Sequence, residues 1–470
     1  MPQERNGVEY YDPKFIAAVT PLKPGWVRYP AGTASLAFDW TAAHMNVGWM
    51  SGLIAANPPL IDQGTANTLS SAQILTQAKG GVSLPDFAEF AQALNANAII
   101  CVNGYTDNNP STTQNMASAA QTYGLKVLEW ELSNEAYLYP QIYSNATAYA
   151  QAMYSPYATG ITAVSPTATI GLFYAGLFPG MSVTTPSWDS ALATYPSRYW
   201  NAASIHIYPM TTTTTANVTI QTLNGVLAHG SSDYITNYLN PMLPPNTPIY
   251  ITEMNCCTYT GNKFLGYLYN GIFLAEYIAR MSTVPNVKAV GVNSLYTDNY
   301  DYHGAIQSVN DYEPYLMGQV AANPGFSTDT STDPNTPYQF YMSAPGVALQ
   351  IANMVINSSN QTWPTTVTGS PTVATLGYDG APIPAIYAQG YRGPGNAHYI
   401  LITNKSNQPR SVSVQLNGSA LQKPLIVTTV SNTNAAAMNT AAAPNAVQIQ
   451  NLTAANPLQV GPYSVTAVTW

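Results

Sequence analysis

The sequence predicts a mixed α/β fold, a (β/α)8 TIM barrel followed by a C-terminal antiparallel β-sandwich. Three observations support this prediction. Seven short apolar runs alternate with helical patterns over the first three quarters of the chain, whereas only strand patterns occur after about residue 361. In addition, 470 residues are too many for one ordinary domain. We therefore expect the barrel at residues 1–360 and the β-sandwich at residues 361–470.

The expected barrel strands are β-branched or apolar runs, several of which end in turn residues. They are Trp26–Pro30, Ala98–Asn103, Val127–Asn134, Thr169–Phe173, Ala203–Tyr208, Ile249–Asn255 and Ala289–Leu295. Apolar strands that alternate with helices are typical of a parallel sheet covered by helices, and this regular spacing favours a (β/α)8 barrel. The first barrel strand would have to come from the first 20 residues, where only the short run GVEYY at 7–11 is available. We therefore expect this strand to be short, degenerate or missing.

Helical patterns lie between these strands. Ser83 is a candidate cap for a helix that carries Pro85 and Asp86 in its first turn and runs to about Leu94. The other expected helices are Thr112–Thr122, Ala146–Val164, Asp233–Leu239, Phe264–Met281 and Gly346–Asn357. The long segment Tyr296–Met342 joins the last barrel strand to its helix, and loops of this length are usually functional or disordered. Its position favours a functional role.

The C-terminal region shows strand patterns separated by turn residues, which is typical of a β-sandwich. The expected strands are Ile383–Tyr391, Ala397–Thr403, Ser411–Leu416, Leu425–Val430, Ala446–Gln450 and Ser464–Trp470. The alanine-rich stretch at 435–446 is of low complexity, and we expect it to form a surface loop.

Composition restricts the classes of function. Hydrophobic residues make up 46% of the chain, so a sizeable core is expected. The net charge is −8 and only 14 residues are Lys or Arg, so no basic stripe can neutralise the phosphates of a nucleic acid. No apolar run approaches the roughly 20 residues of a membrane-spanning helix. We therefore expect neither a nucleic-acid partner nor a membrane-embedded segment.

The low charge content also bears on localisation. Charged residues are only 8% of the chain, against roughly 25% in average soluble proteins. Thr, Ser, Asn, Gln and 34 tyrosines replace them, a composition that resembles secreted proteins or reflects a bias of the lineage. The N-terminal residues MPQERNGVEYYDP are not a signal peptide. We expect a secreted or periplasmic protein whose leader lies outside this sequence.

Three cysteines occur, Cys101, Cys256 and Cys257. They form neither a disulfide framework nor a metal-binding CxxC pattern. The adjacent pair is interpreted as two buried thiols, since free cysteine is commonly buried. The alternative is a strained disulfide between neighbouring residues.

Two glutamates sit at the ends of predicted barrel strands, Glu135 in LSNEAY and Glu253 in ITEMN. Barrel active sites are built at the carboxyl ends of the strands. Glycoside cleavage needs one carboxylic acid to protonate the leaving oxygen and a second carboxylate on the opposite side of the sugar. In a chain with only 22 acidic residues, this pair predicts a glycoside hydrolase with Glu135 as general acid/base and Glu253 as nucleophile.

These motifs resemble the clan A retaining glycosidases, a (β/α)8 superfamily with the acid/base after strand 4 and the nucleophile after strand 7. Asn134 precedes Glu135 as an asparagine commonly precedes the acid/base in that clan, and His206-Ile207-Tyr208 matches a His-x-Tyr motif on strand 6. The segment Arg28–Gly32 resembles the Arg-Tyr-Pro-Gly-Gly motif of families 51 and 79, with Ala31 in place of the first glycine. The closing VGPYSVTAVTW resembles the last strand of the appended β-sandwich. Family 79, of β-glucuronidases, is the nearest, with families 51 and 39 as alternatives.

The resemblance implies roles for the neighbouring residues. Asn134 is expected to bind the sugar 2-hydroxyl, and Tyr208 to keep Glu253 ionised by donating a hydrogen bond. His206 is expected to orient either carboxylate, or to be a satisfied buried imidazole. Arg28 is expected to support the site through a carboxylate partner, or to form a purely structural ion pair.

The sugar is less well defined by the sequence. In family 79 a tyrosine and a glycine after the nucleophile bind the sugar carboxylate, and Tyr259 and Gly261 occupy similar positions here. Candidate sugar-stacking residues are Trp40, Trp49, Tyr137, Tyr139, Tyr296 and Tyr302. We therefore expect an exo-acting retaining β-glucuronidase that needs no metal or organic cofactor and acts on a glycoside or saccharide. The alternatives are a family 51- or 39-like arabinosidase, xylosidase or glucosidase, and a carbohydrate-binding protein on a decayed scaffold. The oligomeric state is not indicated.

Overall fold

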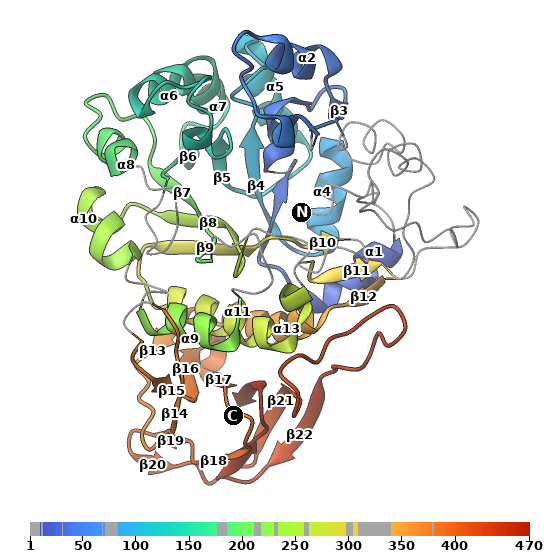
Figure 1. Ribbon diagram of the computed structural model, residues 1–470, viewed down its shortest axis with the longest axis vertical. Coiled ribbons are helices and arrows are strands. Elements are labelled where there is room, and N and C mark those ends of the chain that lie inside the picture. Colours follow the sequence, from blue (N-terminus) through green and yellow to red (C-terminus); the bar gives the residue numbers. More distant parts are fainter. Residues whose placement is uncertain are drawn as a thin grey trace.

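The computed structural model describes residue 10 and residues 13–30, 32–67, 69–70, 83–175, 186–210, 218–229, 234–257, 263–297, 304–308, 340–377 and 380–470. A parallel sheet surrounded by helices forms the upper part of Figure 1, and antiparallel sheets form the lower part. Helices α11 (Leu268–Met281) and α13 (Ala344–Ile356) lie between the two parts. This arrangement confirms the predicted fold class.

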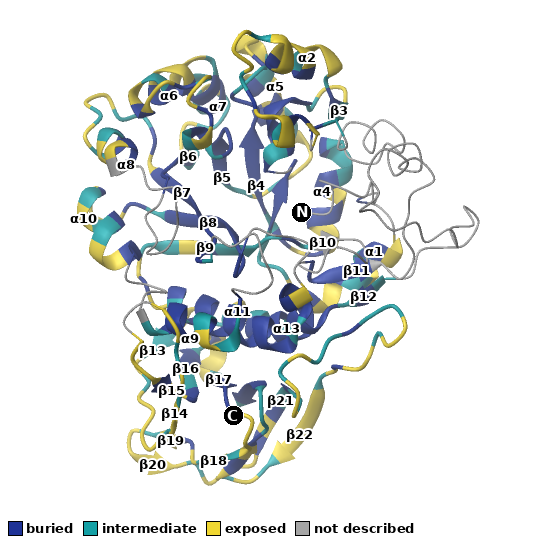
Figure 2. Cartoon of the chain, in the orientation of Figure 1, coloured by how far each residue is buried: buried dark blue, intermediate teal, exposed yellow. Residues whose placement is uncertain are grey.

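Seven parallel strands form the sheet of the barrel in the order β1-β4-β5-β6-β7-β8-β9. They are β1 (Trp26–Tyr29), β4 (Asn97–Val102), β5 (Val127–Leu132), β6 (Ile170–Phe173), β7 (Ala202–Ile207), β8 (Ile249–Met254) and β9 (Val287–Val292). Every predicted barrel strand is present, with small shifts at its ends. Each residue of β6, β7 and β8 is buried, because helices cover the outer face and side chains fill the interior (Figure 2).

Helices and single turns connect the strands on the outside of the barrel. The helices are α1 (Pro13–Val19), α2 (Val47–Ala55), α4 (Leu84–Ala93), α5 (Pro110–Thr122), α6 (Ala146–Met153), α7 (Thr159–Val164), α8 (Pro186–Ala193), α9 (Ile220–His229) and α10 (Asn240–Met242). The turns are η1 (Thr20–Leu22), η2 (Thr33–Leu36), η3 (Ala136–Leu138), η4 (Tyr154–Ala158), η5 (Tyr234–Leu239) and η6 (Lys263–Gly266). Ser83 and Asp86 form the capping box of α4.

The helix predicted over Ala146–Val164 is wrong in one respect, because it breaks near its middle. Ser155 has φ −125° and ψ 128°, which is extended rather than helical backbone. Pro156 follows it, and a proline disfavours the helical conformation of the preceding residue. The segment therefore divides into α6, η4 and α7.

The barrel sheet is open between its two edge strands. In the described part of the chain β1 and β9 do not pair with each other, and a cavity of about 650 Å³ lies between them. Trp26 and Gly291 approach closely across this gap, where a Cβ added to the glycine would lie 2.3 Å from the indole. The run GVEYY, proposed as the first barrel strand, lies outside the described residues except for Tyr10. Tyr10 is buried and lines the cavity.

The C-terminal domain contains a six-stranded antiparallel sheet in the order β13-β16-β17-β24-β21-β22. Its strands are β13 (Gln361–Trp363), β16 (Ile386–Arg392), β17 (His398–Asn404), β24 (Ser464–Thr469), β21 (Leu425–Ser431) and β22 (Gln450–Ala454). Three two-stranded sheets accompany it, and a separate apolar core forms around Ile386, Ile402, Val427, Leu458 and Val468. The strand predicted at Ala446–Gln450 is wrong in position, since β22 begins at Gln450.

The smaller strands complete the described structure. In the C-terminal domain they are β14 (Thr372–Val373), β15 (Ile383–Pro384), β18 (Arg410–Val412), β19 (Gln415–Leu416), β20 (Ser419–Ala420) and β23 (Leu458–Val460), with the turn η7 (Pro394–Asn396). Beside the barrel they are β2 (Phe38–Asp39), β3 (His44–Met45), β10 (Tyr296–Thr297), β11 (Ile306–Ser308) and β12 (Phe340–Met342). Residues 309–339 of the long segment lie outside the described part.

Buried polar contacts join the barrel to the C-terminal domain. Glu276 on α11 is fully buried and accepts hydrogen bonds from Thr403 Oγ1 and Lys405 Nζ, both at 2.6 Å. Arg280, one turn further along α11, donates to the same carboxylate at 2.7 Å. The alanine-rich loop also contributes, because the carbonyl oxygens of Ala437 and Ala435 accept from the first N–H groups of α11. That stretch is a surface loop, as predicted, and it is docked on the start of α11.

Candidate active site

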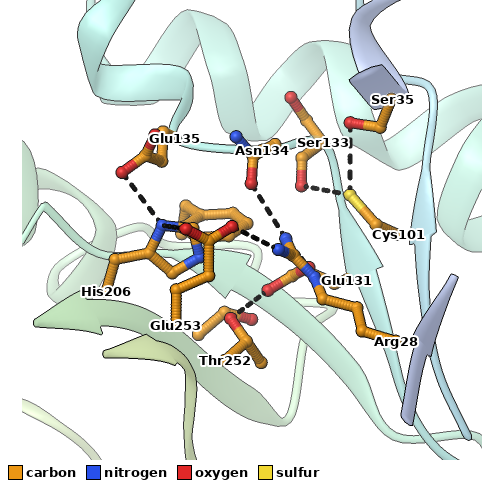
Figure 3. Close-up of polar contacts among 12 residues, drawn as sticks. Arg28, Ser35, Cys101, Glu131, Ser133, Asn134, Glu135, His206, Thr252 and Glu253 are labelled. Atoms are coloured by element: carbon orange, nitrogen blue, oxygen red, sulfur yellow. Dashed lines mark hydrogen bonds and ion pairs between the residues drawn. The ribbon is translucent and has the colours of Figure 1, made fainter. Parts of the chain in front are cut away.

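The two predicted carboxylates lie at the carboxyl ends of the barrel strands. Glu253 belongs to β8, and Glu135 follows β5. Ser133 and Glu135 have φ values of 75° and 48°, which residues other than glycine rarely adopt. Backbone strain of this kind is concentrated at functional sites. In this conformation the Glu135 side chain points toward His206 (Figure 3).

His206 on β7 contacts both carboxylates (Figure 3). Its Nδ1 lies 2.9 Å from Oε1 of Glu135 and 3.6 Å from Oε2 of Glu253. Burial by itself lowers the pKa of the imidazole, but the charges of Glu253 and then Glu135 outweigh it and raise the pKa above the usual 6.5. His206 thus lies against both carboxylates, and their charges favour its protonated form.

Arg28 on β1 is the second cation of the site and is 4% exposed. Its Nη1 donates to Oε1 of Glu253 at 2.6 Å, and its Nη2 donates to Oδ1 of Asn134 at 2.8 Å. On its other edge Nε donates to Oε2 of Glu131 at 2.6 Å. The arginine therefore has the carboxylate partner that was expected, and a further one deeper in the barrel.

Glu253 also accepts two hydrogen bonds from neutral groups. Tyr208 Oη donates to its Oε2 at 2.7 Å and Asn293 Nδ2 donates to the same oxygen at 3.2 Å. Burial would raise the pKa of Glu253, but His206, Arg28 and the tyrosine together lower it below its usual value. The ionised form of Glu253 is consequently favoured, and its carboxylate is held in place.

Arg28 orients the amide of Asn134 so that its nitrogen, Nδ2, remains available to donate a hydrogen bond. A guanidinium can only donate hydrogen bonds, so the amide must turn its oxygen toward Arg28 and its nitrogen away. Asn134 is 1% exposed, and its Nδ2 has no hydrogen-bond partner among the described residues. A buried donor of this kind is suited to a ligand hydroxyl. Nearby, Tyr137 Oη donates to Oε1 of Glu135 at 3.0 Å.

The structure thus brings together six of the predicted residues. They are Arg28, Asn134, Glu135, His206, Tyr208 and Glu253. Their roles in catalysis stay predictions. The other two, Tyr259 and Gly261, lie outside the described residues, so the predicted carboxylate-binding pair has no structural account.

Sequence reasoning missed three residues of this network, namely Glu131, Thr252 and Asn293. The signal for Glu131 was available. In VLEWELSNE, glutamates alternate with apolar residues, so Glu129 and Glu131 share one face of the strand. Two charges on one face of a buried strand, in a chain with 8% charged residues, indicate a polar barrel interior. Thr252 and Asn293 carry no comparable signal, because their residue types are common throughout this chain.

Cys256 and Cys257 lie immediately after β8 and are buried. Their sulfur atoms are 3.8 Å apart, whereas a disulfide requires about 2.05 Å. The structure therefore has two reduced thiols, in agreement with the first interpretation. Cys101 is also free and buried.

Two kinds of feature are absent from the described residues. No helix there is long and apolar enough to cross a membrane. No group of three or more His, Cys, Asp or Glu side chains in the same part of the chain is placed to hold a metal ion.

Comparisons with known proteins place the fold. No protein-family model matches the sequence, and no curated protein matches it. Among solved structures, the family 51 α-L-arabinofuranosidase of Bifidobacterium longum has a TM-score of 0.67 at 14% identity, over 97% of this chain and 89% of that one. The thermostable family 51 α-L-arabinofuranosidase of Thermotoga petrophila has a TM-score of 0.63 at 16% identity, with the same coverage.

A third solved structure shares the fold to a lesser degree. The 4-O-α-L-rhamnosyl-β-D-glucuronidase of Fusarium oxysporum has a TM-score of 0.58 at 13% identity, over 98% of this chain and 93% of that one. At these identities the likeness defines the architecture, a barrel with an appended β domain over nearly the whole chain.

Proposed function

We propose that this protein is a retaining glycoside hydrolase in which Glu253 is the nucleophile and Glu135 the general acid/base. The observation that carries the proposal is the contact of one nitrogen, Nδ1 of His206, with both carboxylates. The two contact distances limit the separation of the nearest carboxylate oxygens to at most about 6.5 Å, which is the lower limit for inverting enzymes. Retaining enzymes hold the two groups about 5–5.5 Å apart.

The different surroundings of the two carboxylates support this division of roles. Glu253 accepts hydrogen bonds from Arg28, Tyr208 and Asn293, which favour the ionised form that attacks the anomeric carbon. Glu135 is the more exposed of the two, with 18% of its side chain accessible. It is therefore the better placed to protonate the leaving oxygen and then to take a proton from the attacking water.

The sugar is the less defined part of the proposal. Similarity of fold to the α-L-arabinofuranosidases supports a neutral pentofuranoside, and similarity to the rhamnosyl-glucuronidase supports a β-glucuronide. The two cations in contact with the carboxylates, Arg28 and His206, are already paired. A uronate would add a further negative charge beside them, so the described residues favour the neutral sugar.

The first experiment is a panel of aryl glycosides that includes α-L-arabinofuranosides, β-D-glucuronides, β-D-xylosides and β-D-glucosides. We expect turnover of at least one substrate, and NMR of the first product should show that the configuration at the anomeric carbon is retained. Glu135→Ala should keep the first step for activated leaving groups, because these need no proton, and azide should restore turnover. Hydrolysis of none of the substrates would favour a carbohydrate-binding protein on a decayed scaffold.

A second experiment tests the uronate alternative. If Tyr259 and Gly261 bind a sugar carboxylate, Tyr259→Phe should weaken glucuronide turnover far more than glucoside turnover. Loss of a hydrogen bond to a charged group costs about 1.5–3 kcal/mol, which is roughly ten- to a hundredfold in selectivity. If the wild-type enzyme prefers arabinofuranosides or glucosides, that preference alone would refute the glucuronidase assignment, and no variant would be needed.

A further inference from the structure

Glu131 is a buried carboxylate in the barrel interior, behind the candidate catalytic groups (Figure 3). Its Oε2 accepts from Nε of Arg28 at 2.6 Å and also contacts Nη2 of the same guanidinium. Its Oε1 accepts from Oγ1 of Thr252 at 2.5 Å. Both oxygens therefore have partners, and two nitrogens on one edge of the guanidinium, Nε and Nη2, contact the same carboxylate oxygen.

This grip determines where the rest of the guanidinium points. The group is planar and its five N–H donors form a rigid fork. Fixing the Nε edge on Glu131 therefore fixes the directions in which Nη1 donates to Glu253 and Nη2 donates to Asn134. Glu131 lies out of reach of a sugar on the far side of Arg28, yet it orients two groups of the candidate site.

Glu131 also divides the charge of Arg28 between two carboxylates. The ionisable groups that face Glu253 are Arg28 from β1, Glu135 from the end of β5, and His206 and Tyr208 from the end of β7. Asn293, from the end of β9, is neutral. Glu129, two residues before Glu131 on β5, has its pKa raised well above the usual value by burial and by the charge of Glu131, which favours its neutral form. Glu131 thus contacts the guanidinium of Arg28 on the edge that does not face Glu253.

We propose that Glu131 is a positioning residue for the reaction, which orients Arg28 and prevents it from neutralising the nucleophile completely. This inference rests on the proposed function in so far as it takes Glu253 to be the nucleophile. A carboxylate that is paired too strongly loses basicity, and with it the ability to attack carbon. The negative charge of Glu131 keeps Glu253 ionised but reactive.

The test replaces the charge and keeps the shape, with Glu131→Gln. The chain has nine glutamates and five histidines, so ¹³C labelling of glutamate carboxyls and ¹⁵N labelling of histidine rings give few NMR signals. Without Glu131, the full charge of Arg28 acts on its neighbours. We expect the titrations of Glu253 and His206 both to move to lower pH, by about one unit. Unchanged midpoints in a folded variant would overturn the proposal.

A matched control separates this effect from loss of a buried carboxylate in general. Glu276→Gln removes another fully buried, ion-paired glutamate, at the domain interface. It should lower stability and leave both titrations unchanged. If Glu131→Gln does not fold, Thr252→Val removes one hydrogen-bond donor from Glu131 and keeps its charge. The charge of Glu131 is then less compensated, so both titrations should move slightly to higher pH, while Thr252→Ser should match the wild type. Absence of any shift with Thr252→Val would likewise count against the proposal.

A turnover measurement completes the test. At its optimal pH, Glu131→Gln should hydrolyse the best aryl glycoside about ten- to a hundredfold more slowly, the effect of losing one charged hydrogen bond. The acidic limb of kcat/KM should move to lower pH. The NMR titrations need no turnover. Shifted midpoints in a protein that cleaves no glycoside would therefore refute the proposed function while the electrostatic role of Glu131 stands.

Discussion

Glu276 joins the two domains. The loss of folding stability expected when this carboxylate is removed can be worked out from its contacts. The carboxylate is fully buried and is bound by Lys405, Arg280 and Thr403. Burial would raise its pKa, but Lys405 and then Arg280 lower it to about 2 from an ordinary value of 4.5. This difference corresponds to about 3 kcal/mol of stability at neutral pH. Breaking one partner of a buried ion pair typically costs 3–5 kcal/mol.

We therefore expect Glu276→Gln to lower the free energy of unfolding by about 3 kcal/mol at pH 7. With an unfolding entropy of about 2.1 cal/mol/K for each residue, this is a fall in Tm of about 3 °C if the domains unfold together. Because the folded pKa is depressed, the contribution is present above about pH 4.5 and is lost as the pH falls toward 2. The difference between wild type and variant should accordingly shrink in acid.

The assay is urea unfolding across this pH range, with Glu89→Gln on the exposed face of α4 as the control. The control should change stability by no more than about 0.5 kcal/mol. Burial lowers the pKa of Lys405 even beside Glu276. In Glu276→Gln, the buried and unpaired charge of Lys405 should therefore account for most of the lost stability. The double variant Glu276→Leu with Lys405→Met should recover much of the loss. A Glu276→Gln variant as stable as the control would refute the reasoning.

Three further predictions concern the barrel. His206→Gln should reduce the free energy of unfolding more at pH 5.5 than at pH 9 in denaturant titrations. Because the folded protein raises the pKa of His206, its contribution to stability is complete below about pH 6.5 and is lost as the pH rises through the pKa of the folded state. A loss of stability that does not depend on pH would contradict this. Tyr208→Phe should reduce kcat/KM by about ten- to a hundredfold through the lost hydrogen bond to Glu253, and an unchanged value would remove Tyr208 from the site. Alkylation under denaturing conditions without reductant should modify all three cysteines by intact mass, whereas a single modified thiol would show one bridge, to be placed by peptide mapping.

The barrel could be predicted from the sequence because its strands are buried on both faces. Segments such as Ile249–Met254 and Ala202–Ile207 read as largely apolar runs, and turn residues follow them. The site followed from the same pattern, since parallel strands bring their carboxyl ends to one face. This is how Glu135 and Glu253, more than 100 residues apart in the chain, could be paired before their contacts with His206 were known.

The remaining features depend on contacts that local patterns do not encode. Strand β22 (Gln450–Ala454) is an exposed edge strand paired on one side only, so it lacks the alternation that identifies half-buried strands. Residues 435–446 are ordered by carbonyl contacts with the start of α11, which is more than 150 residues distant. The gap between β1 and β9 depends on which segment closes the barrel, and the candidate run at 7–11 lies outside the described residues apart from Tyr10.

The central claim, a covalent double displacement at Glu253, is tested most directly by trapping the intermediate. The protein would be incubated with the activated 2-deoxy-2-fluoro glycoside that corresponds to its best substrate in the aryl glycoside panel, and then digested and mapped by mass spectrometry. Withdrawal of electrons by fluorine slows the second step, so the glycosyl-enzyme accumulates. We predict one sugar on the peptide that contains Glu253, and none in Glu253→Gln. Labelling of Glu135 instead, or turnover of the substrate with inversion and no adduct, would contradict the account.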